Sequence, residues 1–98
     1  MEKHEVVKEE LKYDDMTIRL YQPIQGSKVR YESISNISAF NKSGDLIWKA
    51  ERPKSHKDQF WSMWIDQVKK VLTVNSVIGY RYIINFQDGK IIDYYIVK

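Results

Sequence analysis

Apolar, aromatic and β-branched residues are concentrated in two short runs near the C-terminal end of the chain. The first run covers residues 80–87 (YRYIINFQ) and the second covers residues 90–97 (KIIDYYIV), with Asp88 and Gly89 between them. An Asp-Gly pair between two such runs is typical of a two-residue hairpin turn, because both turn positions need positive φ and glycine adopts it freely. The pattern therefore predicts an antiparallel hairpin with a tight turn at Asp88-Gly89.

A weaker form of this pattern occurs in the middle of the chain. Residues 37–40 and 46–50 are two apolar runs, and the polar loop 41–45 (NKSGD) separates them. We expect a second hairpin with a longer loop, in which Gly44 adopts positive φ. The two hairpins contain similar residues in the same order, which indicates an internal repeat of about 45 residues. Phe40, Gly44 and Ile47 correspond to Phe86, Gly89 and Ile92.

The N-terminal third also alternates in polarity. Residues 7–13 and 16–20 alternate on either side of Asp14-Asp15, which predicts a hairpin with an acidic turn. Residues 2–12 also allow a short helix, with its apolar positions on one face. Further along, Pro23 and Gly26 indicate a loop, and a strand is predicted at residues 29–32.

The segment 56–72 allows two interpretations. On a helical wheel its apolar residues form one continuous face, and Ser55 with Asp58 would make an N-terminal capping box. The alternative is a strand at 60–66, a turn at 67–70 and a strand at 71–75, with apolar side chains on both faces as in a central strand. Under either interpretation we expect the three tryptophans, Trp48, Trp61 and Trp64, to pack in the core. Periodicity by itself favours the helix.

Several short motifs follow one another between residues 36 and 98. They are NISAF at 36–40, Gly44, Ile47-Trp48, Pro53, the aromatic run 60–65, Gly79-Tyr80-Arg81, Ile84-Asn85 and Gly89-Lys90-Ile91. In this order they resemble a set of small bacterial proteins of unassigned function. They are also similar to the blade repeat of quinoprotein-type β-propellers, in which a turn glycine precedes a strand with tryptophan. The chain is too short for a propeller and has no quinone-binding constellation, so the resemblance implies only an all-β fold with a strand at 60–66.

Taken together, these patterns predict an all-β fold in a single domain over residues 1–98. We expect an antiparallel meander of about seven or eight short strands with blade-like hairpins. The alternative is an α+β fold with one amphipathic helix at 56–72. The chain has no cysteine, and its first 12 residues are charged throughout. We therefore expect a cytoplasmic protein with no disulfide and no membrane segment.

Few residues suit catalysis or metal binding. The two histidines are His4 and His56, and His56 directly follows Ser55, so their side chains are unsuited to form a dyad. A metal site needs several ligands at suitable spacing, and Asp14-Asp15 is better explained as a turn. We expect no enzymatic activity, no cofactor and no metal. A small hydrolase with an unrecognised site is the remaining catalytic alternative.

One basic cluster, residues 52–57 (RPKSHK), precedes an aromatic run, and the whole chain has a net charge of +3. A basic rim beside aromatic anchors is a suitable composition for an interface with an acidic partner. The predicted binding residues are Arg52, Lys54, His56, Lys57, Trp61 and Trp64, where the last two serve as anchors only in the alternative in which they lie on the surface. We therefore expect a non-catalytic binding protein that acts by surface contact with another protein, as an inhibitor or immunity protein does.

Two further expectations concern the partners. The alternative function is single-stranded nucleic-acid binding, with Tyr31, Trp61 or Trp64 as stacking platforms. A small sheet also leaves edge strands with unpaired backbone groups. We therefore expect a homodimer that pairs through the strand at residues 90–98.

Overall fold

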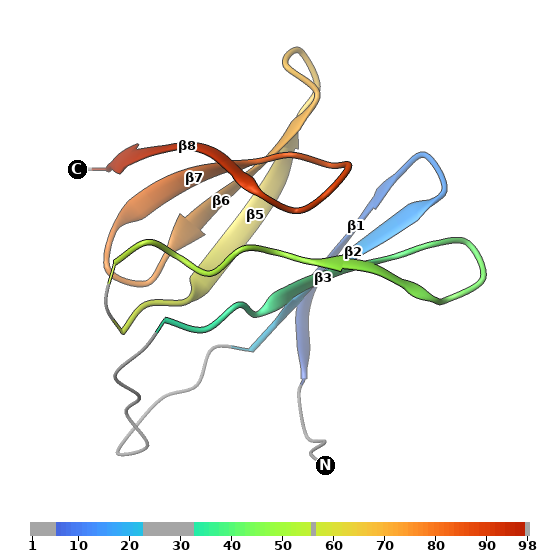
Figure 1. Cartoon of the computed structure of the whole chain (residues 1–98), viewed down its shortest axis with the longest axis horizontal. Coiled ribbons are helices and arrows are strands. Elements are labelled where there is room, and N and C mark those ends of the chain that lie inside the picture. Colours follow the sequence, from blue (N-terminus) through green and yellow to red (C-terminus); the bar gives the residue numbers. More distant parts are fainter. Residues whose placement is uncertain (1–5, 23–32, 56, 98) are drawn as a thin grey trace.

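The computed structural model describes residues 6–22, 33–55 and 57–97, and within these ranges the chain forms eight strands and no helix. The strands are β1 (Val7–Tyr13), β2 (Met16–Tyr21), β3 (Ile37–Phe40), β4 (Leu46–Lys49), β5 (Phe60–Asp66), β6 (Val71–Ser76), β7 (Tyr80–Ile84) and β8 (Ile91–Ile96). They form two antiparallel meanders, β1-β2-β3-β4 and β5-β6-β7-β8 (Figure 1). We call these the N-terminal sheet and the C-terminal sheet. The all-β prediction is confirmed.

Two of the predicted hairpins form as expected. In the first, Tyr13 pairs with Met16, and Asp14 adopts a φ of 53° in the two-residue turn. In the second, Gly44 adopts a φ of 89° and the side chain of Asn41 accepts hydrogen bonds from two backbone N–H groups of its own loop. The predicted strand at 29–32 and the loop at Pro23 and Gly26 lie outside the described residues.

The terminal hairpin forms, but its predicted two-residue turn is wrong. β7 ends at Ile84 and β8 begins at Ile91, so residues 85–90 form the connection. Gly89 has a φ of 75°, whereas Asp88 does not adopt positive φ. The reason is tertiary, because the chain leaves the sheet early to bury Phe86 against the ring of Tyr13, with the ring centroids 3.9 Å apart.

The helix over residues 56–72 is not formed, and β5 and β6 occupy this segment. Asp66 ends β5 because its carboxylate accepts hydrogen bonds from the backbone N–H groups of Val68 and Lys69, both at 3.0 Å. An aspartate that caps the two following residues in this way is typical of a turn. Val68, which belonged to the apolar face of the helical wheel, is 90% exposed in this turn.

Two of the three tryptophans are not in the core. Trp48 is buried as expected, but Trp61 and Trp64 are 43% and 39% exposed. The register of β5 against β6 shifts between Phe60 and Ser62, so Phe60 and Met63 both reach the buried side. A bulge of this kind changes which residues of a strand face the core.

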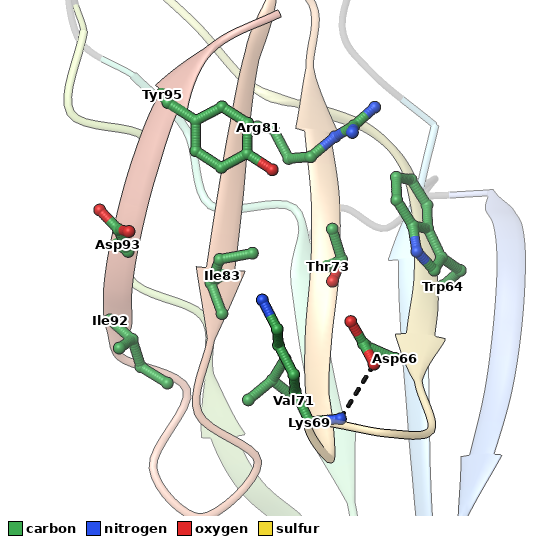
Figure 2. Close-up of a pocket in the computed structure, with 10 residues that line it drawn as sticks. All are labelled: Trp64, Asp66, Lys69, Val71, Thr73, Arg81, Ile83, Ile92, Asp93 and Tyr95. Carbon is green, nitrogen blue, oxygen red and sulfur yellow. Dashed lines mark hydrogen bonds between the residues drawn. The ribbon is translucent and has the colours of Figure 1, made fainter.

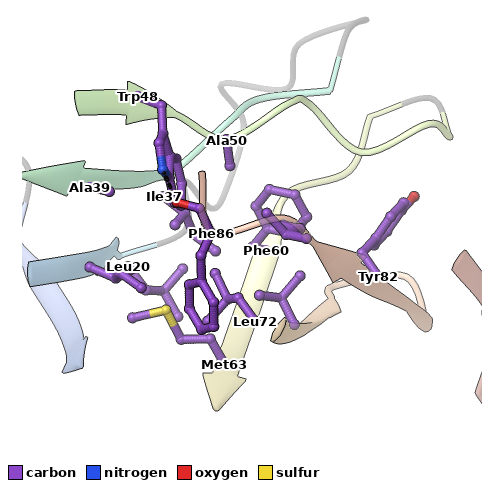
Figure 3. Close-up of a cluster of buried hydrophobic side chains, with 13 residues drawn as sticks. Leu20, Ile37, Ala39, Trp48, Ala50, Phe60, Met63, Leu72, Tyr82 and Phe86 are labelled. Carbon is purple, nitrogen blue, oxygen red and sulfur yellow. Dashed lines mark hydrogen bonds between the residues drawn. The ribbon is translucent and has the colours of Figure 1, made fainter. Parts of the chain in front are cut away.

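The core lies between the inner faces of the two sheets (Figure 3). Ile18, Ile37 and Trp48 come from the N-terminal sheet, and they meet Phe60 and Tyr82 from the C-terminal sheet. The rings of Phe60 and Tyr82 pack edge to face, with centroids 5.7 Å apart. Burial raises the pKa of Tyr82.

Side chains from β1 and from the residue that precedes β3 cover the free edge of β5. The amide of Asn36 donates to the carbonyl of Phe60 at 2.8 Å and accepts from its N–H at 2.8 Å. Beyond it, Glu9 accepts from the N–H of Met63 at 3.2 Å, and Lys8 donates to the carbonyl of Trp61 at 2.9 Å. These bonds satisfy backbone groups that an edge strand would otherwise leave unpaired.

Candidate binding face of the C-terminal sheet

Two rows of side chains cross the outer face of the C-terminal sheet. Strand register makes the members of each row neighbours across β5, β6, β7 and β8. Alternate residues of a strand share one face of the sheet, so these rows lie opposite the core. The first row is Ser62, Asn75, Arg81 and Tyr95, and the second row is Trp64, Thr73, Ile83 and Asp93. We call these eight residues the outer face.

Hydrogen bonds link members of the first row, and a cation–π contact joins the first row to the second. Asn75 donates to the hydroxyl of Ser62 at 3.2 Å and accepts from Nε of Arg81 at 3.0 Å. The guanidinium carbon of Arg81 lies 5.0 Å from the ring centroid of Trp64. Because Arg81 is fixed by uncharged partners, it keeps its charge available to a ligand.

The outer face contains a half-open hollow of about 470 Å³ (Figure 2). Trp64 stands at one side, Tyr95 and Asp93 at the other, and Thr73 lies between them. Asp66 and Lys69 also line the hollow, so two carboxylates and two cations, counting Arg81, balance one another. A volume of this size falls within the range of small-ligand sites or of a few inserted side chains.

Large apolar side chains are exposed around this hollow. Trp64 and Tyr95 are 39% and 48% exposed, and Ile92 beside them is also exposed. Single exposed apolar residues are common, whereas a group of them on one face is characteristic of an interaction site.

The structure separates the predicted binding residues instead of placing them on one surface. Trp64 belongs to the outer face, but Trp61 lies at the other edge of β5, with Nζ of Lys8 4.3 Å from its ring centroid. Arg52, Lys54 and Lys57 lie in the connection between β4 and β5. His56 lies outside the described residues.

The basic connection lies on the core side of the C-terminal sheet. The backbone N–H of Lys54 donates to the hydroxyl of Tyr82 at 2.9 Å, and Tyr82 faces away from the outer face. Nζ of Lys54 also lies 2.6 Å from a carboxylate oxygen of Glu51. This bond, together with the N–H of Ile91, lowers the pKa of Glu51, and Glu51 raises the pKa of Lys54.

Asp58 anchors the same connection to the turn between β6 and β7. Its carboxylate accepts hydrogen bonds from the hydroxyl of Ser55 at 3.1 Å and from the N–H groups of Gln59 and Ile78 at 2.8 and 3.2 Å. Asp58 is buried, so these bonds replace the water that it loses. The Ser55–Asp58 pair that resembled a helix cap therefore fixes a loop.

The part of the chain that the structure describes offers no arrangement for metal binding. No group of three or more His, Cys, Asp or Glu side chains converges there. That part also contains no helix with the length and apolarity needed to cross a membrane.

A family model described as a domain of unknown function, DUF7957, matches residues 1–95. The chain belongs to this family. The matched range begins before β1 and ends within β8, so the DUF7957 unit comprises both sheets. Comparisons with curated proteins and with solved structures gave no match.

Sequence reasoning missed most of the outer face of this DUF7957 domain. Arg81 and Ile83 alternate with the buried Tyr82 and Ile84, so the period of β7 already separates an outer set from a core set. Thr73 alternates in the same way with the buried Leu72 and Val74, but its own burial depends on the neighbouring strands on either side of it.

Proposed function

We propose that this DUF7957 protein is a non-catalytic binding protein that contacts another protein through the outer face. The supporting observation is the grouping of exposed Trp64 and Tyr95 with Arg81 around one hollow. Tryptophan, tyrosine and arginine are the residue types that most often dominate the energy of protein interfaces. A small domain that presents such a face suits the role of an inhibitor or immunity protein.

The charges of the hollow favour a protein over a nucleic acid. Asp66 and Asp93 line it together with Arg81 and Lys69. Single-stranded nucleic acids bind in positively charged grooves with exposed aromatic rings, and carboxylates at such a site repel phosphates. A protein partner can present both signs of charge, and its acidic groups would meet Arg81 and Lys69.

Affinity capture from the native host tests this proposal. Immobilised wild-type protein should retain a partner that Trp64→Ala loses, because a central tryptophan of an interface typically contributes 2 kcal/mol or more, or about 30-fold in affinity. Phe40→Ala is the matched control. Arg19 lies over the ring of Phe40 at 5.2 Å, so this pair on the N-terminal sheet reproduces the contact of Arg81 with Trp64.

The outcomes separate the two functions. Capture that survives nuclease treatment and is lost only in Trp64→Ala supports the protein-binding proposal. Capture that nuclease abolishes, with an affinity that falls steeply with salt, would favour the nucleic-acid alternative. Equal capture by wild type, Trp64→Ala and Phe40→Ala would exclude the outer face as the binding surface.

A further inference from the structure

Thr73 lies in the middle of the hollow, and its side chain ends in a hydroxyl group. Thr73 is 4% exposed, and Trp64 and Ile83 are its cross-strand neighbours on the two sides (Figure 2). Within the described ranges, no residue forms a hydrogen bond with this hydroxyl. A buried polar group without a partner costs free energy, and native proteins retain few of them. Such a group is tolerated where a ligand supplies the missing partner.

The surroundings of Thr73 define the chemistry of that ligand. The hydroxyl can both donate and accept a hydrogen bond. Apolar walls beside it come from Ile83, Val71 and the ring of Trp64. The charged groups around the hollow cancel in number, so they give no net preference for a cation or an anion. These features fit a ligand with an apolar stem and an uncharged head group that can both donate and accept a hydrogen bond.

We infer that the hollow receives a side chain of the partner that ends in an uncharged amide, that is, a glutamine or asparagine. The amide N–H donates to the hydroxyl of Thr73, the hydroxyl donates to the amide oxygen, and the methylene stem lies against Trp64. This inference rests on the proposed function, because the amide belongs to the protein that contacts the outer face. It makes Thr73 the residue that selects the partner.

The first test needs no ligand. Thr73→Val keeps the shape of the side chain and removes the unpaired hydroxyl. Its melting temperature should rise by about 4 °C, which corresponds to about 1 kcal/mol for a domain of this size. Thr17→Val is the control on the N-terminal sheet, where the hydroxyl accepts a hydrogen bond from Lys12 at 2.8 Å. This control should show no rise. A lower melting temperature for Thr73→Val would mean that the hydroxyl is already satisfied in the free protein, and would overturn the inference.

The second test uses acetamide as the probe in a titration of the ¹⁵N-labelled full chain followed by NMR. Acetamide should shift the backbone signal of Thr73 and the indole N–H signal of Trp64. Thr73→Val should weaken acetamide binding about 30-fold, the equivalent of the two hydrogen bonds that it removes. Acetate and methylammonium are the charged probes of similar size. The inference is overturned if either charged probe binds as well as acetamide, or if Thr73→Val binds acetamide as the wild type does.

The partner experiment distinguishes this inference from the proposed function. Thr73→Val should reduce capture of the partner, while Thr17→Val should leave capture unchanged. If Trp64→Ala abolishes capture but Thr73→Val retains it fully, the outer face remains the binding surface and the amide contact is wrong. If both variants capture the partner as the wild type does, the proposed function fails together with the inference.

Discussion

The two sheets have the same strand order but present different outer surfaces. On the N-terminal sheet, Nε of Arg19 lies 2.9 Å from a carboxylate oxygen of Glu10, and Lys12 lies 3.9 Å from the same carboxylate. On the C-terminal sheet, Arg81 is held by the uncharged groups of Asn75 and Trp64. One arginine is neutralised within the protein, and the other keeps its charge beside exposed rings. Shared topology therefore does not determine which sheet can bind.

The hairpin between the third and fourth strands of each sheet also differs between the two sheets. Gly44 and Gly89 both adopt positive φ, at 89° and 75°. A Cβ on Gly44 would meet nothing within 4 Å, whereas a Cβ on Gly89 would lie 2.7 Å from Cδ2 of Trp48. The first glycine serves the turn alone, and the second also leaves room for the core tryptophan of the other sheet.

Substitution of these two glycines should give the largest effect. Gly89→Val adds backbone strain and a collision with Trp48, so we expect a loss of about 3 kcal/mol or more in the free energy of unfolding. Gly44→Val adds only the strain, for which we expect about 1–2 kcal/mol. Urea denaturation of both variants measures the difference. Equal losses would show that Trp48 can move aside and that the two hairpins are equivalent.

The contact between the sheets should give the next largest effect. Asn36→Ala leaves the N–H and the carbonyl of Phe60 without their partners in a buried position, which should cost about 2–4 kcal/mol. Asn75→Ala removes an amide of the same type from the outer face and should cost about 1 kcal/mol or less. Denaturation midpoints report the two values. A smaller loss for Asn36→Ala than for Asn75→Ala would show that the edge of β5 does not depend on this amide.

The free edges of the two sheets offer a third comparison. Among the described strands, β4 and β8 each have a strand neighbour on one side only. Val97 donates to the carbonyl of Gly79, and hydrogen-bonded pairs alternate along an antiparallel ladder, so Tyr94 and Ile96 direct their backbone groups away from β7. We propose that two copies pair through β8. One such N–H, that of Tyr94, is bonded to Asp93 and must exchange this partner on pairing.

Substitutions at the β8 edge and at the β4 edge should have different effects on self-association, which light scattering measures. Ile96→Lys should weaken self-association by about tenfold or more, because it removes an exposed apolar side chain and adds repulsion between the copies. Leu46→Lys makes the same change on β4 and should leave association unchanged. A wild-type protein that is monomeric at high micromolar concentration would exclude pairing through β8.

The smallest effect should come from Glu51, which joins the end of the N-terminal sheet to the start of β8. Its pKa is lowered in the folded state by Lys54 and by the N–H of Ile91. The ionised carboxylate therefore contributes stability above its ordinary pKa of 4.5, and this contribution is lost as the pH falls below that value. Solvent screens the pair because the side chain is more than a third exposed, so we expect about 0.5 kcal/mol or less.

A comparison of wild type with Glu51→Gln measures this contribution. The difference in their free energies of unfolding should be present at pH 7 and should disappear near pH 3. A difference that grows as the pH falls would mean that the folded state stabilises the protonated carboxyl. That result would contradict the lowered pKa of Glu51.

Much of the fold could be predicted from local chemistry. The acidic turn at Asp14-Asp15 and the positive φ of Gly44 follow from residue types that need no distant contact. The strand interpretation of residues 60–75 was also available, although the helical period competed with it. The tight turn at Asp88-Gly89 was wrong because burial of Phe86 against Tyr13, 73 positions earlier in the chain, outweighed the local preference.

The candidate site was much harder to predict. The basic cluster at residues 52–57 is dense in the sequence, but one of its cations, Lys54, pairs with Glu51 and the connection follows the core side of the sheet. Arg81, Thr73 and Tyr95 are separated in the sequence, and only the registers of β6, β7 and β8 make them neighbours. Residues that are close together in the sequence are therefore distributed over different surfaces of the folded chain.

By itself, the sequence determined the fold class, the positions of most strands and the absence of any thiol chemistry, because periodicity, turn residues and composition act over a few neighbouring positions. Tertiary structure decided which tryptophans are exposed, since one bulge in β5 directs Phe60 and Met63 inward and leaves Trp61 and Trp64 outside. It also decided which polar groups meet. Strand register brings distant residues within hydrogen-bond range, and register depends on the packing of both sheets together.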